Sequence, residues 1–396
     1  MPTRCLASIR RSPACAAALV TATVVAHAAA APPTIERLDP ALAAKDTGGE
    51  WAWHDARQLT VEGRGWDDTE RFYDRLPGRA KATVRDAVWR LARHAAGIAV
   101  RFRTDSDRIA ARWTLTHAEL AMPHMPATGV SGLDLYVRDG TAWRWIGTGR
   151  PSGTTSQATL AKGIPAAGDR DYLLFLPLYN GVESLEIGTA PAATPPTAAA
   201  RPPDRAAPIV FYGTSITQGG CASRPGMAYP AILGRRLDRP VVNLGFSGNG
   251  RLEAEVGALI AEVDAAAYVL DCGPNMTVDM VSDRTVPFVV ALRAARPATP
   301  IVLVGTVAYP AGAILPASRA PSADKNAALA AAIDRLTALG VAGLSHVPGD
   351  ALLGTDGEDT VDGTHPTDLG FLRMADALEP TLRRVLDAGG PPAPAP

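Results

Sequence analysis

Five short apolar runs alternate with helical stretches in the C-terminal half of the chain, and no other feature restricts the fold as strongly. The runs are nearly continuous in Val, Ile, Leu and Ala, as is typical of parallel strands that are buried on both faces. Alternation with helices predicts a doubly wound, flavodoxin-like parallel sheet, an α/β domain over residues 208–388. The expected strands are residues 209–212, 240–244, 267–271, 300–305 and 343–347, and the expected helices are residues 228–237, 252–263, 284–295, 323–339 and 367–386.

The preceding half predicts an all-β domain, a sandwich or jelly roll, over residues 32–188. Its short apolar segments are separated by Gly, Asp and Pro turn signals. Apolar and polar side chains alternate along two segments, so we expect one buried and one solvated face. The apolar set is Phe102, Ile109, Ala111 and Trp113, and the polar set is Arg101, Arg103, Arg112 and Thr114.

All seven Trp residues lie in this N-terminal half. Aromatic residues favour strands whatever their function, so the first interpretation is that the Trp side chains fill the core. The alternative is an exposed platform for a sugar ring, formed by Trp51 with Trp53 or by Trp143 with Trp145.

Three segments are predicted to lie outside the two domains. Residues 1–31 carry three Arg residues, an apolar stretch and an Ala-rich cleavage region, which is typical of a secretory signal peptide. Residues 189–207 are rich in Thr, Ala and Pro and predict an extended linker, and residues 389–396 predict a disordered tail. No segment has the length of an apolar membrane span. We therefore expect an exported protein, periplasmic or secreted, without stable membrane insertion.

Charge and cysteine content restrict the partners. The 396-residue chain has a formal net charge of −1, which argues against nucleic acid or an anionic lipid surface as a partner. A neutral substrate is the expectation, and the oligomeric state is left open. Cys221 and Cys272 remain after removal of the predicted signal peptide. They either form a disulfide or stay as two separate, partly buried thiols.

Chemically active residue types follow the carboxyl ends of the expected strands, where ligands bind in open α/β sheets. Ser215 follows the first strand, Gly248 lies in a Gly-rich turn after the second, and Asn275 follows the third. A loop with Asp362 and His365 precedes the last helix. A nucleophile, amide donors and a His–carboxylate pair at one sheet edge are the parts that acyl transfer requires.

Each residue has a role in this hypothesis. Ser215 is the nucleophile, His365 takes its proton, and Asp362 orients the imidazole. The backbone N–H groups of Ser215 and Gly248 and the side-chain amide of Asn275 stabilise the oxyanion. Each motif alone is also compatible with an ordinary turn. It is their order along the chain that favours an active site.

At these residues the sequence resembles the SGNH hydrolases, a branch of the GDSL esterases and lipases, over about residues 207–387. The resemblance implies the roles given above: a nucleophile, two further oxyanion donors and a base. Thr214 stands where the family name has Asp, and the serine that carries the chemistry is kept. The four motifs are Gly-Thr-Ser-Ile-Thr-Gln-Gly with Ser215, Asn-Leu-Gly-Phe-Ser-Gly-Asn-Gly with Gly248, Gly-Pro-Asn with Asn275, and Asp-Gly-Thr-His with His365.

The N-terminal half also carries a resemblance. Gly132-Leu-Asp-Leu-Tyr136 is similar to the GxDLY signature of the β-domain that precedes some SGNH esterases, and residues 221–226 fit the same subgroup. This architecture implies carbohydrate deacetylation. Arg224, just past the nucleophile, either binds the substrate or is a structural Arg that pairs across the loop.

The remaining candidates receive simpler interpretations. Asp271 is an alternative carboxylate, but the Asp-x-x-His spacing favours Asp362. His346 is expected either in the core or in contact with the active-site residues, and a Pro-, Gly- and Ala-rich loop over residues 306–322 is expected to rim the pocket. No recurrent spacing with Cys or carboxylate marks a metal site, and no cofactor motif is present. The histidines considered for such spacing are His54, His94, His117 and His124.

The sequence therefore predicts an exported, metal-independent serine esterase that removes acetyl groups from an acetylated poly- or oligosaccharide through an acyl-enzyme. One alternative is a lipase, lysophospholipase or thioesterase with the same Ser–His–Asp site. The other is a carbohydrate-binding protein with weak catalysis.

Overall fold

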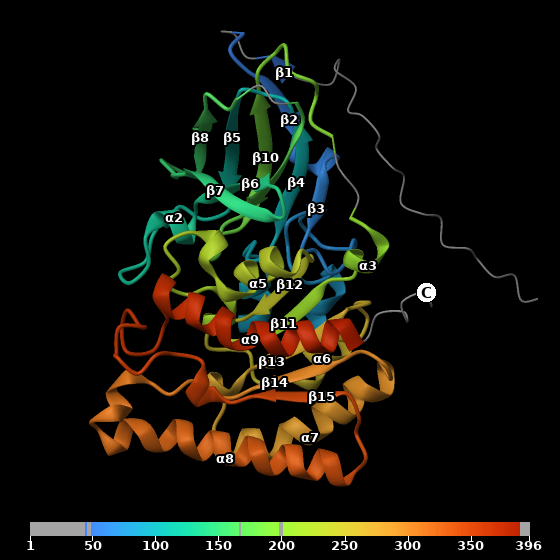
Figure 1. The fold of residues 1–396 in the computed structure, drawn as a ribbon, viewed down its shortest axis with the longest axis vertical. Helices are drawn as coiled ribbons and strands as arrows, with labels where there is room; N and C mark the ends of the chain where they lie inside the picture. The colour runs from blue at the N-terminus through green and yellow to red at the C-terminus, as the bar shows by residue number, and fades with distance from the viewer. Residues whose placement is uncertain (1–43, 46–48, 166–167, 198–200, 389–396) are drawn as a thin grey trace, which may run out of the picture. The chain divides into compact units, whose positions relative to one another are not determined.

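The computed structural model describes residues 44–45, 49–165, 168–197 and 201–388. These residues form three five-stranded sheets (Figure 1). The predicted signal peptide and the predicted C-terminal tail lie outside the described residues. Among the described helices, none combines the length and apolar character that crossing a membrane requires.

The C-terminal sheet is parallel throughout, with the strand order β12-β11-β13-β14-β15. In chain order this is the flavodoxin-like order 2-1-3-4-5, so the predicted fold is confirmed. The first four strands are buried along their whole length, as their continuous apolar runs require. The strands are β11 (Ile209–Gly213), β12 (Val241–Gly245), β13 (Ala267–Asp271), β14 (Ile301–Val304) and β15 (Leu344–Val347).

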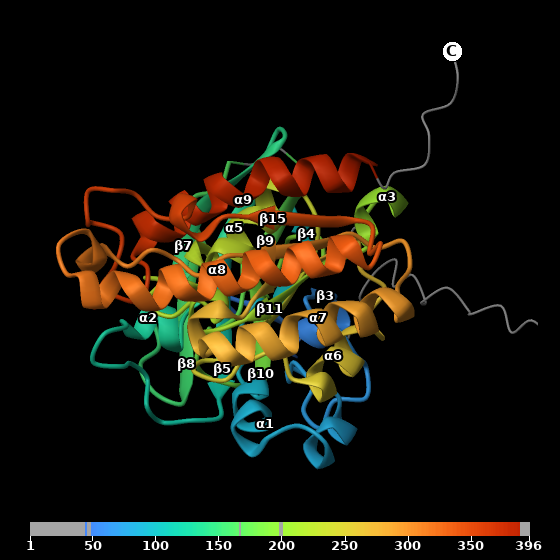
Figure 2. The same ribbon diagram turned by 90° about the horizontal axis from the view of Figure 1, so that it is seen from below.

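Helices cover both faces of this sheet. Helices α5 and α9 pack on the face that carries Phe211 and Val269, whereas α6, α7 and α8 pack on the face that carries Tyr212 and Leu270. Figure 2 shows α9 on one side of β15 and α8 on the other. The helices are α4 (Ser215–Gln218), α5 (Tyr229–Leu237), α6 (Ala254–Ile260), α7 (Val278–Ala295), α8 (Pro316–Ala338) and α9 (Asp368–Ala388).

Two helices begin earlier than predicted. Helix α7 begins at Val278 because the Thr277 hydroxyl accepts the N–H of Met280 (3.2 Å) and caps the helix. Helix α8 begins at Pro316, and proline is well tolerated in a first helical turn. The predicted loop over residues 306–322 therefore ends at residue 315. The predicted core position of His346 is also wrong, because this residue is exposed on the edge strand β15.

The N-terminal half forms two antiparallel sheets, which confirms the predicted β domain. Their strand orders are β1-β2-β10-β5-β8 and β3-β4-β9-β6-β7. The predicted apolar face, with Phe102 and Trp113, lies in the core between them. The opposite face is less solvated than predicted, because Arg101 is only 8% exposed and lies 3.8 Å from the Asp171 carboxylate.

The elements of this half are mostly short. The strands are β1 (Ala44–Lys45), β2 (Ala52–Asp55), β3 (Thr60–Glu62), β4 (Ala99–Thr104), β5 (Arg108–Leu115), β6 (Leu133–Asp139), β7 (Ala142–Gly149), β8 (Thr155–Lys162), β9 (Arg170–Phe175) and β10 (Val182–Thr189). The helices are α1 (Asp86–Ala92), α2 (Ala127–Val130) and α3 (Pro203–Ala206).

One stretch of the N-terminal half, residues 66–92, packs against the α/β sheet. Trp89 of α1 belongs to the apolar cluster on the α6–α8 face of that sheet. Arg75 is 1% exposed and donates hydrogen bonds to the backbone carbonyls of Asn243 (2.9 Å) and Gly245 (2.7 Å) on β12. Residues 66–92 therefore join the two halves across the predicted boundary, and the described residues of both halves belong to one compact unit.

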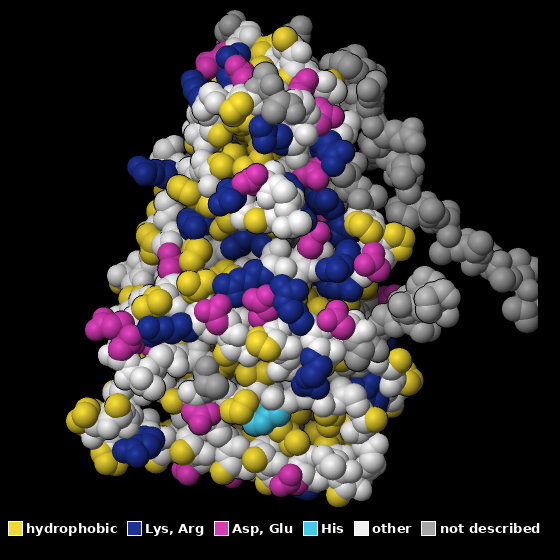
Figure 3. All heavy atoms as spheres, in the orientation of Figure 1, with side chains coloured by type: hydrophobic (Ala, Val, Ile, Leu, Met, Phe, Trp, Pro, Cys, Tyr) yellow, Lys and Arg dark blue, Asp and Glu magenta, His cyan; other side chains and the backbone are white. Residues whose placement is uncertain are grey.

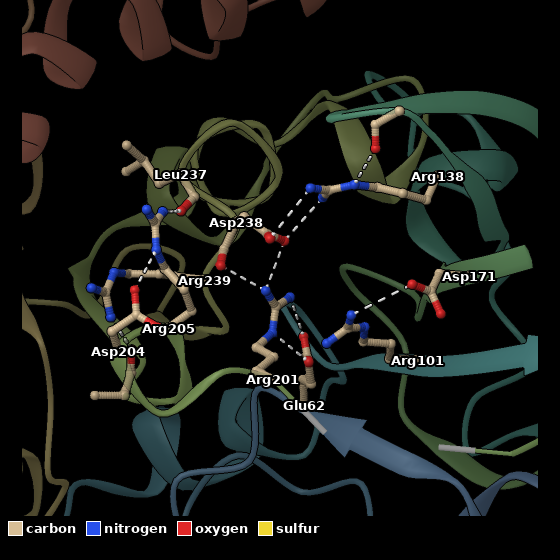
Figure 4. Close-up of polar contacts among 12 residues, drawn as sticks. Glu62, Arg101, Arg138, Asp171, Arg201, Asp204, Arg205, Leu237, Asp238 and Arg239 are labelled. Carbon is tan, nitrogen blue, oxygen red and sulfur yellow. Dashed lines mark hydrogen bonds and ion pairs between the residues drawn. The ribbon is translucent and has the colours of Figure 1, made fainter. Parts of the chain in front are cut away.

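Two described residues of the predicted linker, residues 189–207, are anchored to the rest of the protein. The backbone of Thr197 pairs with β4. The Arg201 side chain is 6% exposed and donates two hydrogen bonds to the Glu62 carboxylate (2.7 and 2.9 Å) and one to the Asp238 carboxylate (2.9 Å), as Figure 4 shows. On the face of the molecule that Figure 3 shows, basic and acidic side chains lie next to one another across the middle. Most described residues of this segment are exposed or half-buried, as predicted, but the Arg201 side chain is buried against the Glu62 carboxylate.

Candidate active site

Ser215 lies at the turn where β11 ends and α4 begins. The Thr214 hydroxyl accepts the N–H of Ile216 (3.2 Å), and the Thr214 N–H donates to the Thr217 hydroxyl (3.3 Å), so both polar groups cap the helix. Gly213 has no room for a side chain, because a Cβ there would lie 2.0 Å from the Thr217 hydroxyl. The turn is therefore fixed, and it leaves Ser215 as the first helical residue, 7% exposed.

The His365 imidazole bridges Ser215 and Asp362. Its Nε2 lies 2.9 Å from Ser215 Oγ, and its Nδ1 lies 2.8 Å from Asp362 Oδ2. A carboxylate only accepts hydrogen bonds, so Nδ1 carries the proton and Nε2 is free to accept the one from Ser215. This tautomer is the one that activates a serine nucleophile.

Asp362 is held by the backbone of its own loop. Its Oδ1 accepts the N–H groups of Thr364 (3.0 Å) and His365 (2.8 Å). Partial burial acts to raise the pKa of the Asp362 carboxyl, but the hydrogen bonds from His365 and Thr364 outweigh it and lower the pKa to about 2. The group is therefore ionised at neutral pH and stabilises an imidazolium beside it.

Asp271, the alternative carboxylate, is buried beneath the nucleophile helix. It accepts hydrogen bonds from Tyr229 Oη (2.9 Å) and Thr217 Oγ1 (3.0 Å). Burial raises the pKa of Asp271 to about 7, although both hydrogen bonds act in the opposite direction. The structure thus places Asp362 at His365 and gives Asp271 a part in fixing the α4 turn.

The three predicted oxyanion donors lie on consecutive strand-end loops. The Ser215 N–H starts a helix and has no acceptor within it. Gly248 is exposed with φ of +69°, a conformation that favours glycine. The Asn275 amide is assigned from its network: Oδ1 accepts the N–H groups of Asn249 (3.0 Å) and Gly250 (3.3 Å), which leaves Nδ2 as the donor.

Sequence reasoning missed Gln218 and His94, which support these loops. Gln218 accepts the N–H of Ser247 (3.1 Å), next to the predicted oxyanion donor, and donates to the carbonyl of Leu178 (3.0 Å). Its Nε2 also lies 3.1 Å from His94 Nδ1. Burial lowers the pKa of His94 to about 3, so the ring is neutral and accepts this hydrogen bond. In the sequence, Gln218 could have been suspected because it lies in the same motif as Ser215, whereas nothing pointed to His94.

Arg224 is held by the residues of the GxDLY motif. Its Nη1 donates to Asp134 Oδ2 (2.7 Å) and to Tyr136 Oη (2.6 Å). The backbone N–H of Gly226 donates to the same Asp134 oxygen (2.9 Å), and Asp134 is fully buried. These contacts fit the structural interpretation of Arg224. Its side chain stays 22% exposed, so contact with the substrate remains a prediction.

Five of the seven Trp side chains are buried in the core. Trp51 and Trp53 are among them, so the platform interpretation is wrong for this pair. Trp145 is 49% exposed, and its Nε1 donates to Asp134 Oδ1 (2.7 Å). It lines a hollow of about 240 Å³, here named the Trp145 pocket. The other lining residues are Thr128, Thr148, Arg150, Ser223 and Arg224.

Cys221 and Cys272 are both free, buried thiols, so the structure favours the second of the two alternatives. Burial raises the pKa of Cys221 to about 12, and the nearby Asp362 carboxylate adds to this. The imidazole of His124 reaches the same place from the N-terminal half, with its ring 5.6 Å from that of His365. Three loops meet here, those of His124, of Cys221 and of the Asp362–His365 pair, and no sequence spacing joined the first two to the third.

The sequence pattern of the GDSL-like lipase/acylhydrolase family matches residues 206–383, and the GxDLY pattern, the N-terminus of SGNH hydrolase-type esterases, matches residues 51–194. A solved structure from Bacteroides ovatus, described as a GDSL-like lipase, is 37% identical, covers 85% of this chain and 98% of its own, and gives a TM-score of 0.80. The chain belongs to the GDSL-like lipase/acylhydrolase family. It is therefore a carboxylic ester hydrolase, and the family prediction is confirmed.

Two further solved structures are similar to this GDSL-like hydrolase in fold. Salicylyl-acyltransferase SsfX3 from a tetracycline biosynthetic pathway is 22% identical over 86% of this chain and 97% of its own, with a TM-score of 0.68. A family two carbohydrate esterase from Cellvibrio japonicus is 15% identical over 85% of this chain and 98% of its own, with a TM-score of 0.53. No curated protein sequence matches the chain.

Proposed function

We propose that this GDSL-like hydrolase removes acetyl groups from a poly- or oligosaccharide through an acyl-enzyme on Ser215. The observation that carries the proposal is that the Trp145 pocket adjoins the loop of the hydrogen-bonded catalytic residues. Ser223 of that pocket donates its N–H to the Asp368 carboxylate (2.9 Å), three residues past His365. In this proposal the sugar binds in the Trp145 pocket, beside the residues that cleave its ester.

The chemistry follows from the hydrogen bonds of the catalytic residues. Ser215 Oγ attacks the ester carbonyl as its proton passes to His365 Nε2, and Asp362 stabilises the imidazolium. The tetrahedral oxyanion is held by the N–H groups of Ser215 and Gly248 and by Asn275 Nδ2. His365 then gives the proton to the departing sugar hydroxyl. Water attacks the acyl-enzyme through the same base, acetate leaves, and Ser215 is regenerated.

The chemistry of the Trp145 pocket suits a sugar. An exposed indole offers an apolar face for the C–H face of a pyranose ring. Hydroxyl and guanidinium groups along the wall supply donors and acceptors for sugar hydroxyls. The carbohydrate esterase from Cellvibrio japonicus shares the fold, which adds support to a carbohydrate substrate.

The space at the nucleophile favours a small acyl group. Ser215 is only 7% exposed. A Cβ on Gly220 would lie 2.9 Å from Tyr179 Oη and 3.2 Å from His365 Cδ2, so the wall beside the nucleophile is closely packed. An acetyl group needs little room, whereas a long acyl chain needs an apolar trough. The rates of turnover of acetate and octanoate esters distinguish the proposed activity from that of a lipase or thioesterase, because the proposed enzyme prefers the acetate.

The Ser215→Ala variant tests the acyl-enzyme. We expect it to lose turnover of a chromogenic acetate ester while its far-ultraviolet circular dichroism and melting curve stay unchanged. Ser345→Ala, on the edge strand β15, is the matched control and keeps full activity. Full residual activity of Ser215→Ala would overturn the assignment of the nucleophile.

Variants of Trp145 test the carbohydrate part separately. Acetate release from acetylated xylan, xyloglucan, mannan and pectin identifies the polysaccharide. We expect Trp145→Ala to raise KM on the preferred polysaccharide while it leaves kcat/KM on the small chromogenic ester unchanged. Trp145→Phe keeps an apolar ring and loses less. Equal effects of Trp145→Ala on both substrates contradict a sugar-binding role.

Export is part of the proposal and rests on the sequence of residues 1–31. Fractionation of cells that express the full chain, with N-terminal sequencing of the product, tests it. A processed protein in the periplasm or medium supports export, and an unprocessed protein in the cytoplasm contradicts it.

A further inference from the structure

Four side chains with metal-binding atoms meet at the edge of the catalytic site. They are His124, Cys221, Asp362 and His365, here named the His124 cluster. One ligand atom from each lies within 4.8 Å of the ligand atoms of all the others. The four residues come from both halves of the chain, so this cluster exists only in the folded protein.

The donor set selects a class of cation. Zinc binds Cys sulfur at about 2.3 Å and His nitrogen or carboxylate oxygen at about 2.0–2.2 Å in a tetrahedron, which places ligand atoms about 3.3–3.8 Å apart. The ligand atoms of the His124 cluster, which lie within 4.8 Å of one another, therefore reach tetrahedral zinc distances if the side chains move by roughly 1 Å. Mg²⁺ and Ca²⁺ prefer oxygen ligands, so a thiol with two imidazoles selects against them.

The cluster is supported by fixed backbone. Cys221 is 5% exposed and has φ of +73°, the left-handed region that non-glycine residues rarely adopt. The next residue, Ala222, packs against α2 so closely that a Cβ on Gly129 would lie 2.2 Å from its carbonyl oxygen. Met122 and Met125 exchange backbone hydrogen bonds of 2.9 and 3.1 Å around His124. The donors are therefore held near one another by packing.

Occupancy of this cluster conflicts with catalysis. His365 hydrogen-bonds Ser215 through Nε2 and Asp362 through Nδ1, and both nitrogens are needed for proton transfer. A metal ion that takes the Asp362 carboxylate and one imidazole nitrogen removes the base from the nucleophile. We propose that Zn²⁺, or another thiophilic divalent cation, binds the His124 cluster and reversibly inhibits the esterase. The proposal that the metal ion binds depends only on the geometry of the His124 cluster, whereas the proposal that it inhibits rests on the proposed function.

Cobalt spectroscopy tests binding without any need for activity. Co²⁺ titrated into the purified full-length Ser215→Ala protein is expected to give visible d–d bands of a tetrahedral ion and a near-ultraviolet thiolate-to-cobalt band. Adding Cys221→Ser removes the thiolate band, and adding His124→Asn weakens Co²⁺ binding at least about tenfold. His346→Asn, an exposed histidine on β15, is the control and changes neither. Melting curves establish that each variant is folded.

Inhibition is measured on the otherwise unaltered enzyme. Zn²⁺ is expected to abolish turnover of the chromogenic acetate ester, and EDTA to restore it. The inhibition constant, taken relative to the metal-free rate of each variant, rises at least about tenfold in His124→Asn and stays constant in His346→Asn. A missing thiolate band, or one that survives in Cys221→Ser, overturns the proposed site. Zn²⁺ inhibition of equal strength in all variants overturns the proposed inhibition. An enzyme without esterase activity refutes the proposed function, while the cobalt spectra still decide the metal site.

Discussion

Replacement of Asp134 tests whether the GxDLY motif holds the substrate side of the active site. Asp134 is fully buried and accepts three hydrogen bonds, from Arg224 Nη1 (2.7 Å), Gly226 N (2.9 Å) and Trp145 Nε1 (2.7 Å). Asp134→Ala removes all three acceptor contacts at once. The change leaves the catalytic residues themselves untouched.

The cost of Asp134→Ala follows from what each donor loses. The N–H of Gly226 is buried and loses its acceptor, which costs about 1–3 kcal/mol. A buried ion pair that loses one partner costs about 3–5 kcal/mol. Arg224 keeps its hydrogen bond to Tyr136 and is 22% exposed, so the lower end applies. With the lower end of both terms, we expect a loss of about 4 kcal/mol in the free energy of unfolding, with a melting temperature lower by roughly 4–8 °C.

Differential scanning calorimetry and kinetics measure the two consequences. Asp134→Asn keeps one acceptor oxygen and is expected to lose less stability than Asp134→Ala. Asp139→Ala, at the exposed end of the same strand, is the control, because an exposed ion pair contributes at most about 1 kcal/mol. Catalytic efficiency of Asp134→Ala should fall more on an acetylated oligosaccharide than on the chromogenic ester. A melting temperature within about 1 °C of wild type refutes the reasoning.

Two further changes test the site and its support. Asn275→Ala removes the predicted side-chain oxyanion donor and is expected to lower kcat by about a hundredfold or more. An unchanged kcat in stopped-flow assays excludes Asn275 from the oxyanion hole. Asp271→Asn tests the buried carboxyl whose pKa is raised to about 7. Because the folded state binds this proton more tightly than the unfolded state, the contribution of Asp271 to wild-type stability falls by about 1.4 kcal/mol per pH unit between about pH 4 and 7. The variant is therefore expected to gain stability relative to wild type over this window in urea denaturation, and a pH-independent difference contradicts the assignment.

Four strands of the α/β sheet, β11 to β14, were predictable because each is a nearly continuous apolar run between turn residues. The starts of α7 and α8 were not, because Thr277 gives no sign of capping until its hydroxyl meets Met280. Pro316 was predicted to lie in the Pro-, Gly- and Ala-rich loop, although it begins helix α8. Local sequence thus indicated which elements exist, and side-chain contacts decided where they begin.

The candidate site divides in the same way. Ser215 and His365, which the structure brings together, and the predicted oxyanion donors were proposed from sequence alone because their motifs follow strand ends in a fixed order. The His124 cluster was not predictable, because His124 and Cys221 lie far from each other and from the Asp362–His365 pair in the chain. The anchored linker has the same explanation: Arg201 looks solvated in a Pro-rich segment until the fold supplies Glu62. Long-range partners are the information that a single sequence does not display.

The hydrogen bonds from Arg75 to β12 limit how such enzymes can be recombined. A fragment that starts near residue 206, where the family pattern begins, leaves the carbonyls of Asn243 and Gly245 without this donor and uncovers the apolar surface beneath Trp89. A hybrid that joins the catalytic half to a foreign β-domain must therefore also inherit residues 66–92. The unit that can be exchanged between relatives is the nearly complete chain, although the catalytic motifs occupy only its second half.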